Sequence, residues 1–223
     1  LRVNNRGHDP VSRGPMDGQR FGAAYEMVDD CCQDWDAWIS FAQGAGYRNI
    51  GLWGHSLGAV KSIYYMATEK DSRIKSMVAS SPPRFSYNTY QSMDDWGKYV
   101  EQLEEAQKHI SDGHPEALME VRYPSANLLT AGVFLDKYGP GEKYDVIGLL
   151  PNVKVPTLVT LGSLEGVERG QSNSLMGFAG LGGELEKLSG ELDHVAYASV
   201  LNGDHFYTGQ REPAWKIVEG FLA

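Results

Sequence analysis

Short apolar runs alternate with longer amphipathic stretches along the chain. The runs are bounded by glycine, proline or polar residues, which is typical of strands that pair in a buried sheet. They cover residues 1–5, 49–53, 74–80, 157–163 and 195–201. Because strands and helical stretches alternate in this order, the sequence predicts an α/β fold with a mostly parallel sheet and right-handed crossovers.

The helical stretches show apolar residues on one face. Between residues 22 and 44, Trp35, Trp38, Ile39 and Ala42 recur at helical spacing, and glycines end the pattern. Three further helices are predicted after the later strands, over residues 57–70, 174–190 and 212–223. Each of them has apolar positions that can cover a face of the sheet.

The pattern changes between Pro82 and Pro151. Here the sequence predicts helices without intervening strands, one beginning near Ser92 and another running from Ser125 toward Tyr138. This stretch of about 70 residues lies between two predicted strands. We therefore expect a core formed by residues 1–81 and 152–223, with residues 82–151 as a helical cap insertion.

Composition and charge narrow the classes of function. The chain of 223 residues has 42% hydrophobic and 22% charged residues, which is typical of one globular domain, and no apolar stretch approaches the length of a membrane span. The net charge of −9 and the lack of a lysine or arginine cluster argue against nucleic acid and favour a small neutral or cationic substrate. Cys31 and Cys32 are adjacent in a helical pattern, so we interpret both as packing residues.

The sequence GHSLG, residues 54–58, follows one predicted strand directly and precedes a predicted helix. A G-x-S-x-G turn in this context is typical of the turn that presents the nucleophile of serine hydrolases. Gly54 and Gly58 would leave room for the tight crossing of strand and helix. We expect Ser56 to be the nucleophile and the backbone N–H of Leu57 to be one donor of the oxyanion hole.

A serine nucleophile needs a base and a carboxylate that orients the base. Glu165 and His205 each come just after a predicted strand, at the same edge of the sheet as Ser56. Glu168 is the second candidate for the acid, whereas Asp204 adjoins His205 too closely in sequence. No cofactor is expected, and no pair of histidines has the spacing of metal ligands near a carboxylate.

Together these motifs resemble the α/β-hydrolase family along essentially the whole chain. RGHD at residues 6–9 resembles a loop of that fold, and VPTLVTLGSLE at 155–165 and NGDHF at 202–206 resemble its acid and histidine segments. The resemblance implies acyl transfer to water through an acyl-enzyme intermediate. The leading prediction is hydrolysis of a carboxylic ester of a small or medium uncharged substrate. Amide hydrolysis, carbon–carbon bond hydrolysis and a non-catalytic ligand-binding receptor are the alternatives. Four cap aromatics are candidates to line the pocket or to form the cap core: Trp96, Tyr99, Phe134 and Tyr138.

The resemblance also implies a strand that is not accounted for. Only one helix separates residues 1–5 from residues 49–53, so residues 1–5 correspond to the family's fourth strand. The family's third strand would lie between these two runs, and unpaired buried backbone there would cost about 1 to 3 kcal/mol per group. We expect an upstream segment or a second chain to complete the sheet and to supply the second oxyanion donor.

Overall fold

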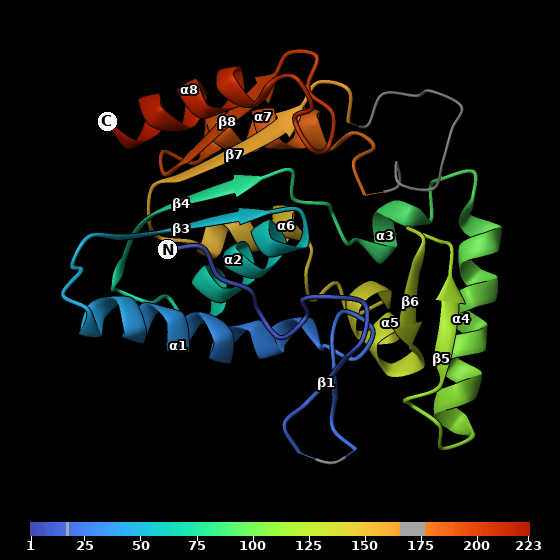
Figure 1. Cartoon of the computed structure of the whole chain (residues 1–223). Coiled ribbons are helices and arrows are strands. Elements are labelled where there is room, and N and C mark those ends of the chain that lie inside the picture. Colours follow the sequence, from blue (N-terminus) through green and yellow to red (C-terminus); the bar gives the residue numbers. More distant parts are fainter. Residues whose placement is uncertain (17, 166–176) are drawn as a thin grey trace.

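The computed structural model describes residues 1–16, 18–165 and 177–223. Its centre is a four-stranded sheet with the strand order β3-β4-β7-β8, and every pair in it is parallel (Figure 1). The strands are β3 (Ile50–His55), β4 (Ile74–Ser80), β7 (Thr157–Gly162) and β8 (Val195–Val200). These are the four runs after residue 48 that the sequence pattern predicts as strands, so the predicted α/β class is confirmed.

Helices cover both faces of this sheet. α1 (Cys31–Gly44), α2 (Leu57–Thr68) and α7 (Leu181–Glu191) contribute to the larger hydrophobic cluster, and α8 (Arg211–Leu222) packs on the opposite face. Neighbouring residues of β4 show the division, because Met77 belongs to the larger cluster and Val78 packs against Val218 of α8. The central strands β4 and β7 are thus buried on both sides, as in most parallel sheets, whereas one face of the edge strand β3 is exposed.

Residues 1–5 do not form the strand that their sequence predicts. A cavity of about 1020 Å³ separates residues 1–8 from β3. Residues 1–5 therefore pair with no strand among the described residues. A strand requires such a partner for its backbone hydrogen bonds. β3 therefore forms one edge of the described sheet, and the additional strand stays a prediction. The loop that follows contains β1 (Ser12–Arg13), β2 (Arg20–Phe21) and the short 3-10 helix η1 (Val28–Asp30).

Most of the segment between β4 and β7 lies beyond the carboxyl ends of β3 and β4, and its last part packs against α2 (Figure 1). It contains α3 (Tyr87–Tyr90), α4 (Trp96–Ser111), α5 (Ala131–Tyr138), α6 (Val146–Leu149) and the 3-10 helix η2 (Leu150–Asn152). The prediction that this segment has no strands is wrong, because β5 (Leu118–Val121) and β6 (Asn127–Thr130) form an antiparallel pair. In β5, Met119 and Val121 are buried and their neighbours are exposed, which is the period of a half-buried strand.

The helix predicted from Ser125 begins later than expected. Thr130 ends β6, and its side chain accepts a hydrogen bond from the N–H of Val133, which caps α5. The residues before Thr130 pair with β5 and so cannot take helical geometry. Within the described ranges, none of the helices is both long enough and apolar enough to cross a lipid bilayer.

Candidate active site

Ser56 lies at the junction of β3 and α2 in a strained backbone conformation. Its φ is 56° and its ψ is −126°, a backbone conformation that residues other than glycine rarely adopt. A Cβ atom at Gly54 would lie 2.2 Å from the carbonyl oxygen of Gly58, so the crossing of strand and helix needs a glycine at position 54. Nothing obstructs a Cβ atom at Gly58 itself. The tight turn directs the Ser56 hydroxyl away from the sheet.

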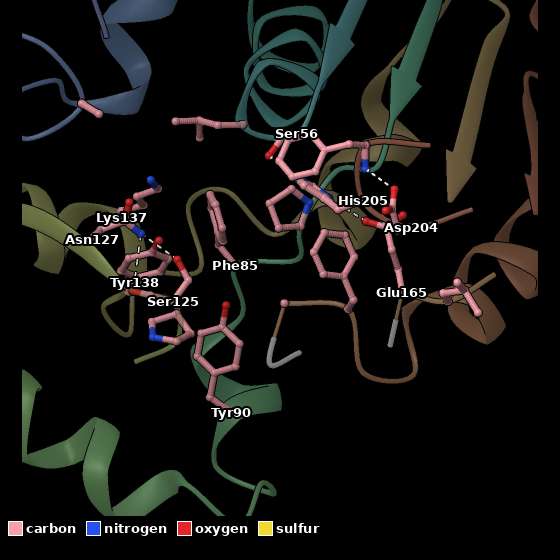
Figure 2. A pocket seen from close by; sticks show the side chains of 18 residues that line it. Ser56, Phe85, Tyr90, Ser125, Asn127, Lys137, Tyr138, Glu165, Asp204 and His205 are labelled. Carbon is pink, nitrogen blue, oxygen red and sulfur yellow. Dashed lines mark hydrogen bonds and ion pairs between the residues drawn. The ribbon is translucent and has the colours of Figure 1, made fainter. Parts of the chain in front are cut away.

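Three side chains from separate loops form one hydrogen-bonded chain (Figure 2). The Oγ atom of Ser56 lies 2.9 Å from Nε2 of His205, and Nδ1 of His205 lies 2.6 Å from Oε1 of Glu165. The three residues follow β3, β8 and β7, whose carboxyl ends meet at the same edge of the sheet. In the neutral imidazole, Nδ1–H donates to the carboxylate, so Nε2 accepts from the serine hydroxyl. The structure thus brings together the nucleophile, base and acid expected from the sequence.

The carboxylate of Glu165 is held on both oxygens. Oε2 accepts from the N–H of Gly162 and from the Ser81 hydroxyl, both at 2.7 Å, and the side chain is only 3% exposed. Behind it, Oγ of Ser81 lies 2.9 Å from the hydroxyl of Tyr207, which lies 2.8 Å from Oγ1 of Thr160. Neither Ser81 nor Tyr207 was predicted from the sequence. The position of Ser81 directly after β4 is the one available signal.

Of the other two acidic residues considered for this position, the structure describes Asp204 but not Glu168. Asp204 accepts hydrogen bonds from the N–H groups of Phe206 and Thr208, each at 2.9 Å, and these hold the histidine loop. The same backbone hydrogen bonds lower the pKa of Asp204. Glu168 lies outside the described residues.

We expect Ser81→Ala to lower kcat about 10- to 150-fold for any substrate that needs the His205 imidazole. The substitution removes one of two hydrogen bonds to Oε2, and a hydrogen bond to a charged group contributes about 1.5 to 3 kcal/mol. Ser81→Thr keeps the hydroxyl and is the matched variant. Its kcat should lie between those of Ser81→Ala and the wild type. Steady-state kinetics with one substrate measures both. An unchanged kcat in Ser81→Ala would show that Gly162 alone orients the acid.

Other rings fix the position of the imidazole of His205. His55 donates from Nε2 to the carbonyl oxygen of His205 at 2.7 Å, and the two rings have centroids 5.0 Å apart. Burial lowers the pKa of His55, which favours its neutral form beside the base. Phe178 contacts the His205 ring edge to face at 5.3 Å. These contacts limit rotation of the base.

The N–H of Leu57 is available for an oxyanion. Leu57 is the first residue of α2, and its N–H has no hydrogen-bond partner among the described residues. Leu57 lines the same cavity as Ser56. The positive end of the α2 dipole adds to the attraction for a developing negative charge.

The cavity beside Ser56 has a volume of about 550 Å³. Of the four cap aromatics considered, Tyr138 lines it, whereas Tyr99 and Phe134 are fully buried in the core and Trp96 packs against Tyr99. The described residues contain no group of three or more histidine, cysteine, aspartate or glutamate side chains that could hold a metal ion. The remaining walls of the cavity beside Ser56 consist of apolar and polar side chains from the segment 82–151 and from the loops after residue 176. They include Phe85, Tyr90, Ser125, Asn127, Lys137, Phe178 and Phe206.

No protein-family model matches the sequence, and no curated protein matches it either. Solved structures do. An esterase from Pyrococcus furiosus is 18% identical with a TM-score of 0.54, over 92% of this chain and 66% of that one. The α/β hydrolase GrgF from Penicillium sp. sh18 is 13% identical with a TM-score of 0.59, over 92% and 75%. Est1E from Butyrivibrio proteoclasticus is 16% identical with a TM-score of 0.55, over 91% and 71%.

This chain therefore spans about two thirds to three quarters of each of these proteins. The alignments cover more than nine tenths of this chain. At such low identities the likeness concerns the arrangement of the backbone and not the chemistry. The sheet order, the strained serine turn and these structural matches together show that the chain has the α/β-hydrolase fold.

Proposed function

We propose that this protein is a serine hydrolase that cleaves carboxylic esters through an acyl-enzyme intermediate. The observation that carries the proposal is the hydrogen-bonded chain of Ser56, His205 and Glu165 at the wall of a cavity. Its order along the chain, serine then acid then histidine, is that of the α/β-hydrolases. The esterase among the similar structures supports the choice of an ester by analogy.

In the proposed reaction, Oγ of Ser56 attacks the ester carbonyl carbon while Nε2 of His205 accepts the hydroxyl proton. The N–H of Leu57 donates to the oxyanion that forms. The tetrahedral intermediate collapses, and Nε2 returns the proton to the leaving alkoxide oxygen, which departs as the alcohol. Water then attacks the acyl-enzyme by the same route. Glu165 holds the imidazole in the required tautomer and stabilises it when it is protonated.

We further propose that residues 82–151 act as a cap over this cavity. Phe85, Tyr90 and Tyr138 come from that segment and line the cavity (Figure 2). Glu165 and His205, which follow β7 and β8, line its other side. A wall of this kind excludes water and selects the acyl or alcohol group by shape. In this role the cap would select the substrate, while the ends of β3, β7 and β8 would perform the chemistry.

A panel of esters and amides with graded acyl length tests the proposal. We expect hydrolysis of short and medium esters by the purified protein, with rates at least about a hundredfold above those for the matched amides, because amines are poorer leaving groups than alcohols. Initial rates measured in a pH-stat compare the two series directly. Faster hydrolysis of the amides would instead favour an amidase, and hydrolysis of neither series would remove the proposed function.

A further inference from the structure

Lys137 places a positive charge in the wall of the cavity. It lies in the last turn of α5 and is only 9% exposed, and it lines the cavity that also contains Ser56. A lysine that is buried to this degree is usually paired with a carboxylate. Its partners therefore indicate whether the charge serves the fold or a ligand.

Nζ of Lys137 makes no hydrogen bond or ion pair with any residue that the structure describes. Its close neighbours are aromatic, with the ring centroids of Phe85 and Tyr138 at 5.2 and 5.3 Å. The C-terminal end of α5 lowers the cost of the charge but leaves Nζ without an acceptor. Lys61 gives the contrast, because it is equally buried and both oxygens of Glu26 lie 2.6 Å from its Nζ.

Two polar side chains lie on the same wall. Nδ2 of Asn127 lies 2.6 Å from Oγ of Ser125, and both residues line the cavity with Lys137 (Figure 2). A hydroxyl and an amide beside an ammonium group are donors that can share one anion. The aromatic walls exclude water, which strengthens the attraction between the ammonium group and an anion.

The charges of the cavity are separated along its length. Glu165 and Asp204 lie at the end next to the His205 imidazole, and Lys137 lies on the opposite side, beyond Ser56 (Figure 2). A substrate with one negative group would be repelled from the carboxylate end and attracted to the lysine end. This separation would orient the reactive carbonyl toward Ser56.

We propose that Lys137 binds a carboxylate of the substrate, so that the preferred ester carries one ionised carboxyl group. One ammonium group matches a monovalent carboxylate better than a phosphate dianion, which needs more positive charge. The inference rests on the proposed ester hydrolysis and replaces the neutral or cationic substrate expected from the net charge of −9. The net charge is a sum over the whole surface, whereas Lys137 acts inside one cavity.

Matched ester pairs test the proposal and locate the carboxylate. Monoethyl esters of dicarboxylic acids of three to six carbons carry it in the acyl part, and acetyl esters of small hydroxy acids carry it in the alcohol part. In each pair the control substrate has a neutral carboxamide in place of the carboxylate. We expect kcat/KM for the acid to exceed that for the amide by at least tenfold in one of the two series.

Variants then assign the preference to one residue. Lys137→Met and Lys137→Gln should reduce the preference for the acid over the amide about 10- to 100-fold, and Lys137→Arg should retain most of it. Lys98→Met is the matched control, because Lys98 is exposed on α4 and pairs with Asp95. It should keep the wild-type preference. No preference in the wild type, or an unchanged preference in folded Lys137→Met or Lys137→Gln, would overturn the proposal.

A binding measurement separates this inference from the proposed function. In Ser56→Ala, calorimetry is carried out with monoethyl succinate and with an acetyl ester of a small hydroxy acid, and at least one of the two should bind at least tenfold more weakly once Lys137→Met is added. If wild type hydrolyses no ester yet this difference is present, the carboxylate site stands and ester hydrolysis fails. If esters are hydrolysed and the difference is absent, the inference about Lys137 fails and the hydrolase stands.

Discussion

Replacing Ser56 by alanine is expected to lower kcat for ester hydrolysis by about 10⁴- to 10⁶-fold. The substitution removes the oxygen that would form the acyl-enzyme, while Nε2 of His205 and the Leu57 N–H remain in place. What activity is left would come from the oxyanion donor and from substrate binding alone. Steady-state kinetics on the best ester of the panel, with circular dichroism to verify folding, measures the effect.

Ser189→Ala is the control for this substitution. Ser189 lies on α7 away from the cavity, and its hydroxyl donates to the carbonyl oxygen of Glu186 on an exposed helix face. This variant should retain the wild-type kcat within about twofold. If folded Ser56→Ala lost less than tenfold, a nucleophile other than Ser56 would have to perform the reaction.

Glu26→Gln is expected to lower the free energy of unfolding by about 3 to 5 kcal/mol. Glu26 and Lys61 are 4% and 5% exposed, and both carboxylate oxygens of Glu26 lie 2.6 Å from Nζ of Lys61. Removing one partner of a buried pair leaves an uncompensated charge in the interior, which costs far more than the loss of a surface pair. Lys61 lies on α2, so the effect would be transmitted to the helix that begins beside Ser56.

Urea unfolding followed by tryptophan fluorescence measures this loss, with the slope of the transition as a test of two-state behaviour. Glu120→Gln is the matched control, since Glu120 is 79% exposed in its pair with Arg122. Its effect should stay below about 0.5 kcal/mol. Equal effects of the two substitutions would mean that the pair between Glu26 and Lys61 contributes no more than a surface contact.

Much of the fold could be predicted from local sequence patterns. The strands of the parallel sheet are short apolar runs, and β4 and β7 are buried on both faces, so such runs are recognisable without tertiary information. The β5–β6 hairpin was missed because each strand has only four residues, of which two are buried. Two buried residues in a short strand are not distinguishable from one turn of an amphipathic helix.

The candidate site was also predicted only in part. Ser56, Glu165 and His205 each follow a strand end, so their positions along the sequence predict that they meet. Ser81 and Lys137 were missed because their surroundings are set by tertiary packing. Ser81 contacts Glu165 across 84 residues, and the burial of Lys137 depends on rings from other parts of the chain. Neither contact has a local signature in the sequence.

The position of the carboxylate also explains why Glu165 fits the acid better than Asp204. Glu165 approaches Nδ1 of His205 from the end of β7, across the gap between two neighbouring strands. Asp204 shares a loop with His205 and uses its carboxylate for the N–H groups of that same loop. An acid from a separate strand can orient the ring, because its own position does not move with the histidine loop.

The most direct test of the central claim is reaction of the wild-type protein with a fluorophosphonate, followed by peptide mass spectrometry. We expect one stoichiometric adduct on Ser56, concurrent loss of esterase activity, and much slower labelling of His205→Ala because the base is missing. Heat-denatured protein should not react. Active protein that carries no adduct on Ser56, or an inactivating adduct at another residue, would contradict the assignment of Ser56 as the nucleophile.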